Sequence, residues 1–362
     1  MKIGLVGCGN ISDVYLQNLR RFEGLEVAVC ADLDGARARS QAAKHGVPHA
    51  CTTEALVTDP AVECVLDLTP PAAHFEIARR ALEAGKHAYN EKPLAASRAE
   101  GRQLLDAARR RGLRIGCAPD TFLGAGLQTC RKALDAGLVG APVAATAFMM
   151  YAGHEQWHPD PEFFYQPGAG PLFDMGPYYL TALVHLLGSV RRVCASAKTT
   201  YAERVIATGP KRGTRFPVGA PTHVAAVLDF DGGATAMLMM SFDGWYHELP
   251  VLEVYGTEGS MSVPDPNTFG GTVRVRRART ETWEPLPTAF GYAENSRGLG
   301  LADMAEAIRA GRPHRASGEL AFHVLDVMEA CYESSREGRH IEVSSRCGRP
   351  EPMREGLAFG EL

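Results

Sequence analysis

Three side chains in this sequence are well suited to proton chemistry: a lysine, an aspartate and a tyrosine. Lys92 lies in the segment Asn90-Glu91-Lys92-Pro93, directly after a short apolar run. An ammonium group in this position can polarise a substrate oxygen and stabilise an alkoxide. Asp174 and Tyr178 are four residues apart in a helical pattern, so we expect them to share one face and to relay a proton. The structural alternative is an aspartate favoured by the helix dipole beside a core tyrosine.

A glycine-rich turn near the start of the chain suits a dinucleotide. Gly7 and Gly9 flank Cys8 between an apolar run and a helical pattern, which lets the backbone approach a diphosphate. Asp32 follows the next apolar run and can accept hydrogen bonds from a ribose 2′-hydroxyl. We predict NAD rather than NADP because Asp32 would repel a 2′-phosphate, although Arg37 could still accommodate NADP. The alternative is an ordinary glycine turn that binds no ligand.

The elements expected to position these residues follow two different sequence patterns, one in each part of the chain. Up to about residue 118, apolar runs alternate with amphipathic helical patterns, which favours a parallel sheet with helical crossovers. The expected strands are Lys2–Val6, Leu25–Ala31, Val62–Leu68, His87–Asn90 and Arg114–Cys117, and the helices include Ala72–Ala84 and Ser97–Arg111. We therefore predict an α/β Rossmann dinucleotide-binding domain over residues 1–120.

The second part of the chain reads as an α+β domain with a large, mostly antiparallel open sheet. Thr222–Phe230 and Ala234–Phe242 are apolar runs joined by Asp231-Gly232-Gly233, which is typical of a hairpin. Further strands are expected at Val139–Tyr151, Val190–Tyr201, Val251–Tyr255 and Thr272–Arg276. Helices are expected at Gly124–Ala136, from the segment Gly168–Tyr179 to about Leu187, at Leu299–Ala310 and at Glu319–Arg336. We assign substrate binding and oligomerisation to residues 121–345 and a poorly ordered polar tail to residues 346–362.

Composition narrows the class of partner. The 362 residues carry a formal net charge of −4, which argues against nucleic acid or an anionic membrane as a partner. No apolar run approaches the length of a membrane span, and no secretion signal is visible. The nine cysteines form no C-x-x-C pair, so a reducing, cytoplasmic location is expected.

An aromatic segment between the two parts suits a sugar ring. Trp157, His158 and Tyr165 lie just before the Asp174 helix, and aromatic rings with a few polar groups are typical of a small-molecule site. We predict these three as substrate-binding residues. We expect no metal, because His154 and His158 lack a third ligand at an obvious spacing.

Four motifs together make the chain resemble the glucose–fructose oxidoreductase / inositol dehydrogenase (Gfo/Idh/MocA) family. They are Gly7-Cys8-Gly9-Asn10-Ile11, Thr69-Pro70-Pro71…His74, Gly85-Lys86-His87…Glu91-Lys92-Pro93 and Asp174-x-Gly176-x-Tyr178. The resemblance implies a tightly bound nicotinamide cofactor, oxidation or reduction of sugars or polyols, and dimers or tetramers. It also implies that the cofactor is held by Gly7, Gly9, Asn10, Ile11, Asp32, Thr69, Pro70, His74, Glu91 and Lys92. Many members carry histidine four residues after the aspartate, where this chain has Tyr178, so Tyr178 or Lys92 with Asp174 remains open as the proton carrier.

Three functions stay in view at this stage. The first is an NAD(H)-dependent dehydrogenase or reductase acting on a sugar, polyol or sugar derivative. The second is a redox-assisted glycoside-cleaving enzyme that recycles its own NAD. The third is a non-catalytic nicotinamide-sensing protein, which would need none of Lys92, Asp174 and Tyr178. Because Ala234–Met240 is too apolar for a solvated sheet face, we also predict a homodimer or homotetramer.

Overall fold

The computed structural model describes all 362 residues and contains two large sheets. The first is a six-stranded parallel sheet with strand order β3-β2-β1-β4-β5-β6. Its strands are β1 (Lys2–Val6), β2 (Glu26–Ala31), β3 (His49–Cys51), β4 (Cys64–Asp67), β5 (His87–Asn90) and β6 (Ile115–Cys117). The helices between them are α1 (Ser12–Leu19), α2 (Gly35–His45), α3 (Thr53–Thr58), α4 (Pro71–Glu83) and α5 (Arg98–Arg111). This arrangement confirms the predicted Rossmann sheet.

Local sequence signals explain where these helices begin and end. The side chains of Asp34, Thr52 and Ser97 cap the N-termini of α2, α3 and α5 by accepting backbone N–H groups. Gly46 and Gly112 end α2 and α5 in the left-handed conformation that glycine adopts without strain. Strand β4 is buried along its whole length, as expected for a central parallel strand covered on both faces.

The second sheet has nine strands in the order β16-β15-β14-β13-β7-β12-β11-β8-β17. Only β7 and β12 pair in parallel; the other neighbours are antiparallel. The strands are β7 (Pro142–Met150), β8 (Val190–Lys198), β11 (His223–Phe230), β12 (Thr235–Ser241), β13 (Leu252–Gly256), β14 (Gly259–Val263), β15 (Arg274–Arg277), β16 (Glu284–Pro285) and β17 (Ile341–Glu342). Strands β9 (Glu203–Val205) and β10 (Arg215–Pro217) form a separate hairpin. The predicted mostly antiparallel sheet and the β11–β12 hairpin are confirmed.

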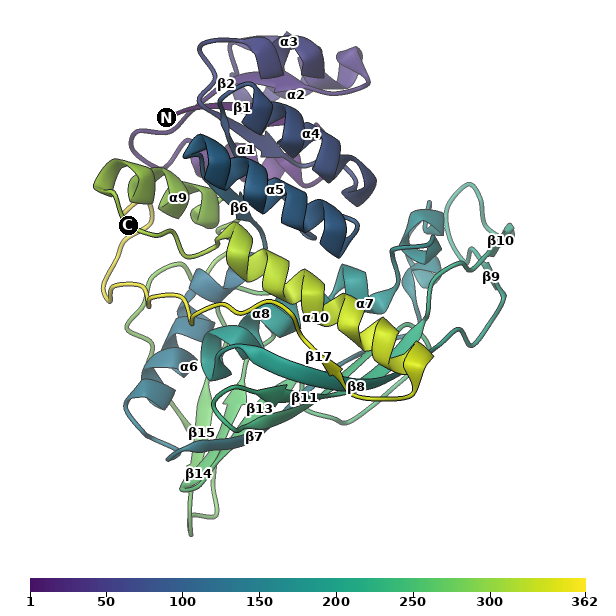
Figure 1. The fold of residues 1–362 in the computed structure, drawn as a ribbon, viewed down its shortest axis with the longest axis vertical. Helices are drawn as coiled ribbons and strands as arrows, with labels where there is room; N and C mark the ends of the chain where they lie inside the picture. The colour runs from purple at the N-terminus through teal and green to yellow at the C-terminus, as the bar shows by residue number, and fades with distance from the viewer.

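Helices of the second part lie between the two sheets (Figure 1). They are α6 (Ala125–Asp135), α7 (Pro171–Asp174), α8 (Gly176–Leu187) and α10 (Gly318–Glu337), while α9 (Leu299–Ala310) lies beside the parallel sheet. On β12 the side chains of Ala236, Leu238 and Met240 are buried, whereas Met237 is 56% exposed. The large sheet therefore has a covered face and an open face. None of the helices combines the length and the apolar character that crossing a membrane requires.

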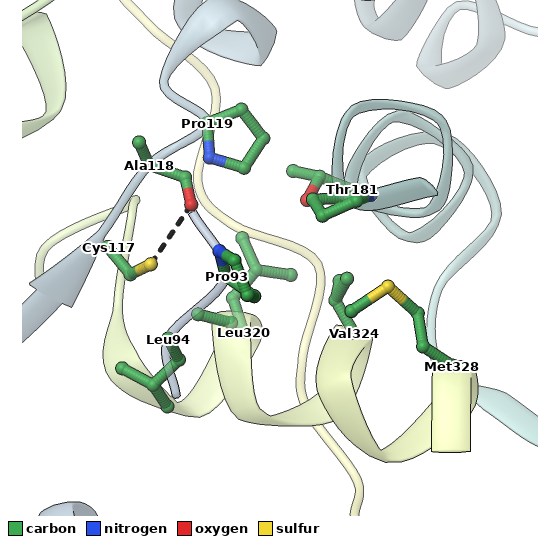
Figure 2. Close-up of a pocket in the computed structure, with 11 residues that line it drawn as sticks. Pro93, Leu94, Cys117, Ala118, Pro119, Thr181, Leu320, Val324 and Met328 are labelled. Carbon is green, nitrogen blue, oxygen red and sulfur yellow. Dashed lines mark hydrogen bonds between the residues drawn. The ribbon is translucent and has the colours of Figure 1, made fainter. Parts of the chain in front are cut away.

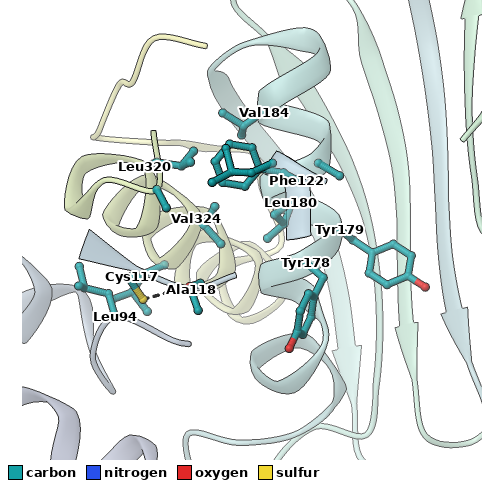
Figure 3. Close-up of a cluster of buried hydrophobic side chains, with 14 of the residues drawn as sticks. Leu94, Cys117, Ala118, Phe122, Tyr178, Tyr179, Leu180, Val184, Leu320 and Val324 are labelled. Atoms are coloured by element: carbon teal, nitrogen blue, oxygen red, sulfur yellow. Dashed lines mark hydrogen bonds between the residues drawn. The ribbon is translucent and has the colours of Figure 1, made fainter. Parts of the chain in front are cut away.

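A small apolar pocket marks the seam between the two parts (Figure 2). Pro93 and Leu94 follow β5, Thr181 lies on α8, and Val324 and Met328 lie on α10. A buried cluster continues along this seam (Figure 3). In that view Tyr179 points toward the strands of the large sheet, whereas its neighbour Tyr178 points away from them.

Two predictions are wrong. The helical pattern around Asp174 is not continuous: α7 ends at Asp174 and α8 begins at Gly176, because Pro177 lacks an N–H group and cannot continue α7. The tail after residue 345 is not poorly ordered, since Met353 and Leu357 are buried. The Arg315 guanidinium also binds the carbonyl oxygens of Glu351 and Pro352, so the tail packs along the molecule without regular structure.

Candidate active site

The glycine turn after β1 leaves room for a dinucleotide. Gly7 has φ +96°, and a Cβ there would lie 2.7 Å from the Leu68 backbone carbonyl carbon, so this position requires glycine. A Cβ at Gly9 would meet no atom within 4 Å, so the space in front of Gly9 is open. Ser12 is fully buried and its hydroxyl donates to the Gly9 carbonyl oxygen at 2.6 Å, which holds the turn closed on α1. The residues present therefore fit the phosphates of a nicotinamide dinucleotide.

The end of β2 presents the predicted ribose-binding carboxylate. Asp32 accepts the backbone N–H of Cys8 and that of Asp34, each at 2.8 Å, so the carboxylate is fixed beside the glycine turn. The Arg37 guanidinium lies 3.7 Å from Asp32 Oδ1, and its side chain is more than half exposed. The positive charge of Arg37 is therefore directed to Asp32 itself.

The turns after β4 and β5 lie side by side because their strands are paired in parallel. Thr69 and Pro70 follow β4, and α4 places His74 back against this turn, where its imidazole reaches the Thr69 and Pro93 carbonyl oxygens. The Glu91 carboxylate accepts the hydroxyl of Tyr15 from α1 at 2.7 Å. Asn10 and Ile11 lie in the turn before α1. The residues predicted to hold the cofactor thus gather at the carboxyl edge of the parallel sheet.

Lys92 and Asp174, predicted from separate motifs, form an ion pair across the two parts of the chain. Lys92 Nζ donates to Asp174 Oδ1 at 2.8 Å and to the Asp174 carbonyl oxygen at 2.7 Å. Burial alone would lower the pKa of Lys92, but the Asp174 carboxylate reverses this and the net shift is upward. Burial likewise opposes ionisation of Asp174, but Lys92 and His154 hold its pKa below the ordinary value. Both groups are therefore charged throughout the neutral range.

His154 completes the site, and sequence reasoning missed this role. Its Nε2 lies 3.3 Å from Asp174 Oδ2, on the side of the carboxylate away from Lys92. The imidazole stacks on Phe164 with ring centroids 3.6 Å apart and meets Phe242 edge-on at 4.8 Å. The Tyr151 hydroxyl lies 3.0 Å from His154 Nδ1. The sequence indicates His154 only as a metal-ligand candidate, because no periodicity relates it to Asp174.

Tyr178 lies beside the ion pair, and its ring faces Lys92. Lys92 Nζ is 5.5 Å from the centre of the Tyr178 ring. Burial raises the pKa of Tyr178, while the positive charges of Lys92 and Arg297 act in the opposite direction. Arg297 comes from the loop before α9, and the sequence contained no signal for it beyond its charge. Its guanidinium group donates to the side-chain oxygens of Asn295 and Asn267.

The three predicted substrate-binding residues differ in their exposure and contacts. Trp157 is 59% exposed, and its ring centroid is 5.2 Å from that of His154. The ring centroids of Trp157 and His158 are 5.4 Å apart. The Tyr165 ring is fully buried and its hydroxyl donates to the Glu155 carboxylate. Arg204 of β9 pairs with the same carboxylate at 2.6 Å and also with Asp243. Tyr165 therefore stabilises the segment that carries His154, through its contact with Glu155.

Family models match most of the chain. Residues 1–118 match the oxidoreductase family with an NAD-binding Rossmann fold, and residues 127–262 match the GFO/IDH/MocA C-terminal domain. Among curated proteins, a D-xylose 1-dehydrogenase (NADP(+)) of Haloferax volcanii is 26% identical over 95% of this chain and 100% of its own length. A 1,5-anhydro-D-fructose reductase of Ensifer adhaerens is 29% identical over 94% of this chain and 98% of its own length.

Solved structures share the fold over nearly the whole chain. An NAD-binding oxidoreductase from Klebsiella pneumoniae superposes with a TM-score of 0.82 at 24% identity, covering 95% of this chain and 99% of that one. Levoglucosan dehydrogenase in complex with NADH and L-sorbose gives a TM-score of 0.83 at 20% identity with the same coverage.

Proposed function

The chain belongs to the Gfo/Idh/MocA family of oxidoreductases, and we propose that it transfers hydride between NAD(H) and a hydroxyl or keto carbon of a sugar, polyol or sugar derivative. The observation that carries this proposal is the Lys92–Asp174 ion pair, which joins the carboxyl edge of the Rossmann sheet to α7. Relatives named as sugar dehydrogenases and reductases support the carbohydrate-like substrate. When bound, the nicotinamide supplies the hydride acceptor or donor.

In this proposal the Lys92 ammonium contacts the reacting oxygen. Because Asp174 keeps Lys92 protonated, the ammonium donates a hydrogen bond to a substrate carbonyl in reduction and stabilises the alkoxide in oxidation. Asp174 fixes the direction of Lys92 and takes its second contact from His154. Either Lys92 or the Tyr178 phenol carries the proton.

The cofactor would be held by the glycine turn and by Asp32. We propose NAD rather than NADP, because the Asp32 carboxylate lies beside the glycine turn, where it suits ribose hydroxyls and would repel a 2′-phosphate, and because Arg37 is directed to that carboxylate. Trp157 and His158 are proposed to contact the sugar, with Tyr165 supporting them through Glu155.

We also propose that copies of the chain associate through the open face of the nine-stranded sheet. Met237 and Val227 are opposite each other on β12 and β11 and are 56% and 43% exposed. An exposed apolar strip on a sheet face is typical of an interface. The nine cysteines are all free, which supports a reducing, cytoplasmic location.

A panel experiment tests the activity. The protein is incubated with NAD+ and with sugars, polyols and glycosides, and the absorbance of reduced nicotinamide is followed. Turnover with at least one free sugar or polyol supports the proposal, whereas glycoside cleavage without accumulation of reduced nicotinamide would point to the redox-assisted alternative. Tyr178→Phe then separates the two proton carriers, because a large loss of turnover assigns the proton to the phenol and a small loss assigns it to Lys92.

A further inference from the structure

His74 differs from the other buried histidines in what its two ring nitrogens face. Its Nδ1 lies 2.7 Å from the Pro93 carbonyl oxygen and its Nε2 lies 2.8 Å from the Thr69 carbonyl oxygen. A carbonyl oxygen can only accept, so both contacts are hydrogen bonds only when both nitrogens carry hydrogen. A neutral ring would direct a lone pair at one of the two oxygens in a site with no access to water.

His323 provides the contrast within the same molecule. It is also fully buried, but its Nε2 accepts the backbone N–H of Val190 at 3.0 Å while its Nδ1 faces the Ser345 hydroxyl at 2.8 Å. Those partners suit a neutral ring, and burial lowers the pKa of His323 to about 4. The two histidines therefore have equal burial but opposite hydrogen-bonding requirements.

A buried carboxylate lies close to His74, because Asp67 and His74 both contact Thr69. Asp67, the last residue of β4, accepts the backbone N–H and the hydroxyl of Thr69 through Oδ1, at 3.0 and 2.6 Å. Its Oδ2 is buried without a hydrogen-bond partner. The pKa of Asp67 is raised on balance, because burial outweighs the opposing effects of a charge on His74 and of the Thr69 hydrogen bonds. A buried carboxylate and a buried imidazolium thus supply each other's missing counter-charge.

The other charged groups of this patch already have partners. Glu91, from the turn after β5, accepts the Tyr15 hydroxyl, and Lys92 from the same turn is paired with Asp174. The neighbouring thiol of Cys117 on β6 has its pKa raised by burial and is uncharged. Asp67 is the carboxylate of this group whose Oδ2 has no hydrogen-bond partner, and it shares Thr69 with His74.

We propose that His74 is held as an imidazolium balanced by Asp67, and that it clamps the turn after β4 to the turn that carries Lys92. One N–H bond goes to Thr69, in the turn proposed to lie along the cofactor, and the other goes to Pro93, next to Lys92. His74 is a positioning residue, and its role in the reaction rests on the proposed function. The protonation state of His74 does not depend on the proposed function.

The direct test is side-chain nitrogen NMR of the full-length protein labelled with ¹⁵N-histidine at pH 7.5. His74→Gln assigns the His74 signals, and His323 in the same spectrum serves as the neutral reference. The proposal expects both His74 nitrogens to show the shifts of a protonated imidazolium. A His74 ring with one unprotonated nitrogen, like that of His323, would overturn it, whatever the protein's activity.

The variant Asp67→Asn isolates the charge, because the amide oxygen can still accept both Thr69 hydrogen bonds. We expect His74 to lose its second proton at pH 7.5 and the Kd for NADH to rise about tenfold as one clamp bond is lost. The matched control is Asp59→Asn, at a carboxylate that accepts a backbone N–H in the turn after α3. It should change neither the His74 spectrum nor the Kd for NADH. An unchanged His74 spectrum with unchanged NADH affinity in Asp67→Asn would contradict the pairing.

Discussion

The turn after β5 and the connection between β7 and α8 each supply half of the candidate site, but they hold their side chains by different means. The turn that carries Lys92 is short and fixed by backbone bonds, such as that from the Glu91 N–H to the Asp67 carbonyl oxygen at 2.8 Å. The connection that carries His154 and Asp174 is long and is fixed by side chains, chiefly the Arg204–Glu155 ion pair and the aromatic stack. Changes in the turn should therefore affect the chemistry, and changes beneath the connection should affect folding.

The largest effect is expected at the turn. Lys92→Ala should lower turnover roughly 10²–10⁴-fold, the usual range for loss of a positioned acid or base, and leave the NADH affinity nearly unchanged. Steady-state kinetics on a verified substrate, with a fluorescence titration of NADH, measures both. Lys132→Ala, at an exposed lysine paired with Glu355, is the control and should keep full turnover. Near-normal turnover of Lys92→Ala would remove the whole site assignment.

The second-largest effect is expected on stability, from a change beneath the connection between β7 and α8. Arg204 is buried between Glu155 and Asp243, so Arg204→Met leaves two carboxylates without their counter-charge. We expect the free energy of unfolding to fall by about 3–5 kcal/mol, measured by urea denaturation. Adding Glu155→Gln should recover part of the loss because it removes one of the uncompensated charges. A loss below about 1 kcal/mol would show that the connection is held by other contacts.

A third, smaller effect is expected in the relative affinities for NADH and NADPH. NADH should bind about tenfold or more tightly than NADPH, because the 2′-phosphate would meet the Asp32 carboxylate. Asp32→Ser should narrow that difference. Tighter binding of NADPH by the unchanged protein would reverse the assignment and give Arg37 the role of phosphate ligand.

The smallest effect on the site is expected from the open face of the large sheet. Met237→Asp should convert the oligomer to a smaller species in light scattering at micromolar concentration, with turnover per chain changed little. Val205→Asp, at an exposed residue of the separate β9–β10 hairpin, should leave the mass unchanged. A monomeric unmodified protein would contradict the predicted assembly.

The two halves also differ in how well the sequence predicts them. Five of the six Rossmann strands and the Lys92 turn can be predicted, because buried parallel strands give unbroken apolar runs and the turn follows one of them. Strand β3 is not predicted, because its three residues are not buried and form no apolar run. The β11–β12 hairpin is readable from its Asp-Gly-Gly turn. Pro177 was a visible signal for the break between α7 and α8, although the apolar pattern outweighed it.

Tertiary contacts account for what the sequence did not reveal. His154 reaches Asp174 only because Arg204 and Tyr165, from other elements, hold Glu155. Residue type alone cannot distinguish the buried Tyr165 from the exposed Trp157. The tail contains few apolar residues, yet the buried side chains of Met353 and Leu357 are enough to anchor it to the core.

The central claim is that the Lys92 ammonium contacts the reacting oxygen, and a crystal structure with NADH and the substrate identified by the panel tests it most directly. We predict a substrate oxygen within about 2.6–3.2 Å of Lys92 Nζ, with the Lys92–Asp174 pair retained. A substrate whose reacting oxygen lies beyond hydrogen-bonding reach of Lys92 would contradict the account.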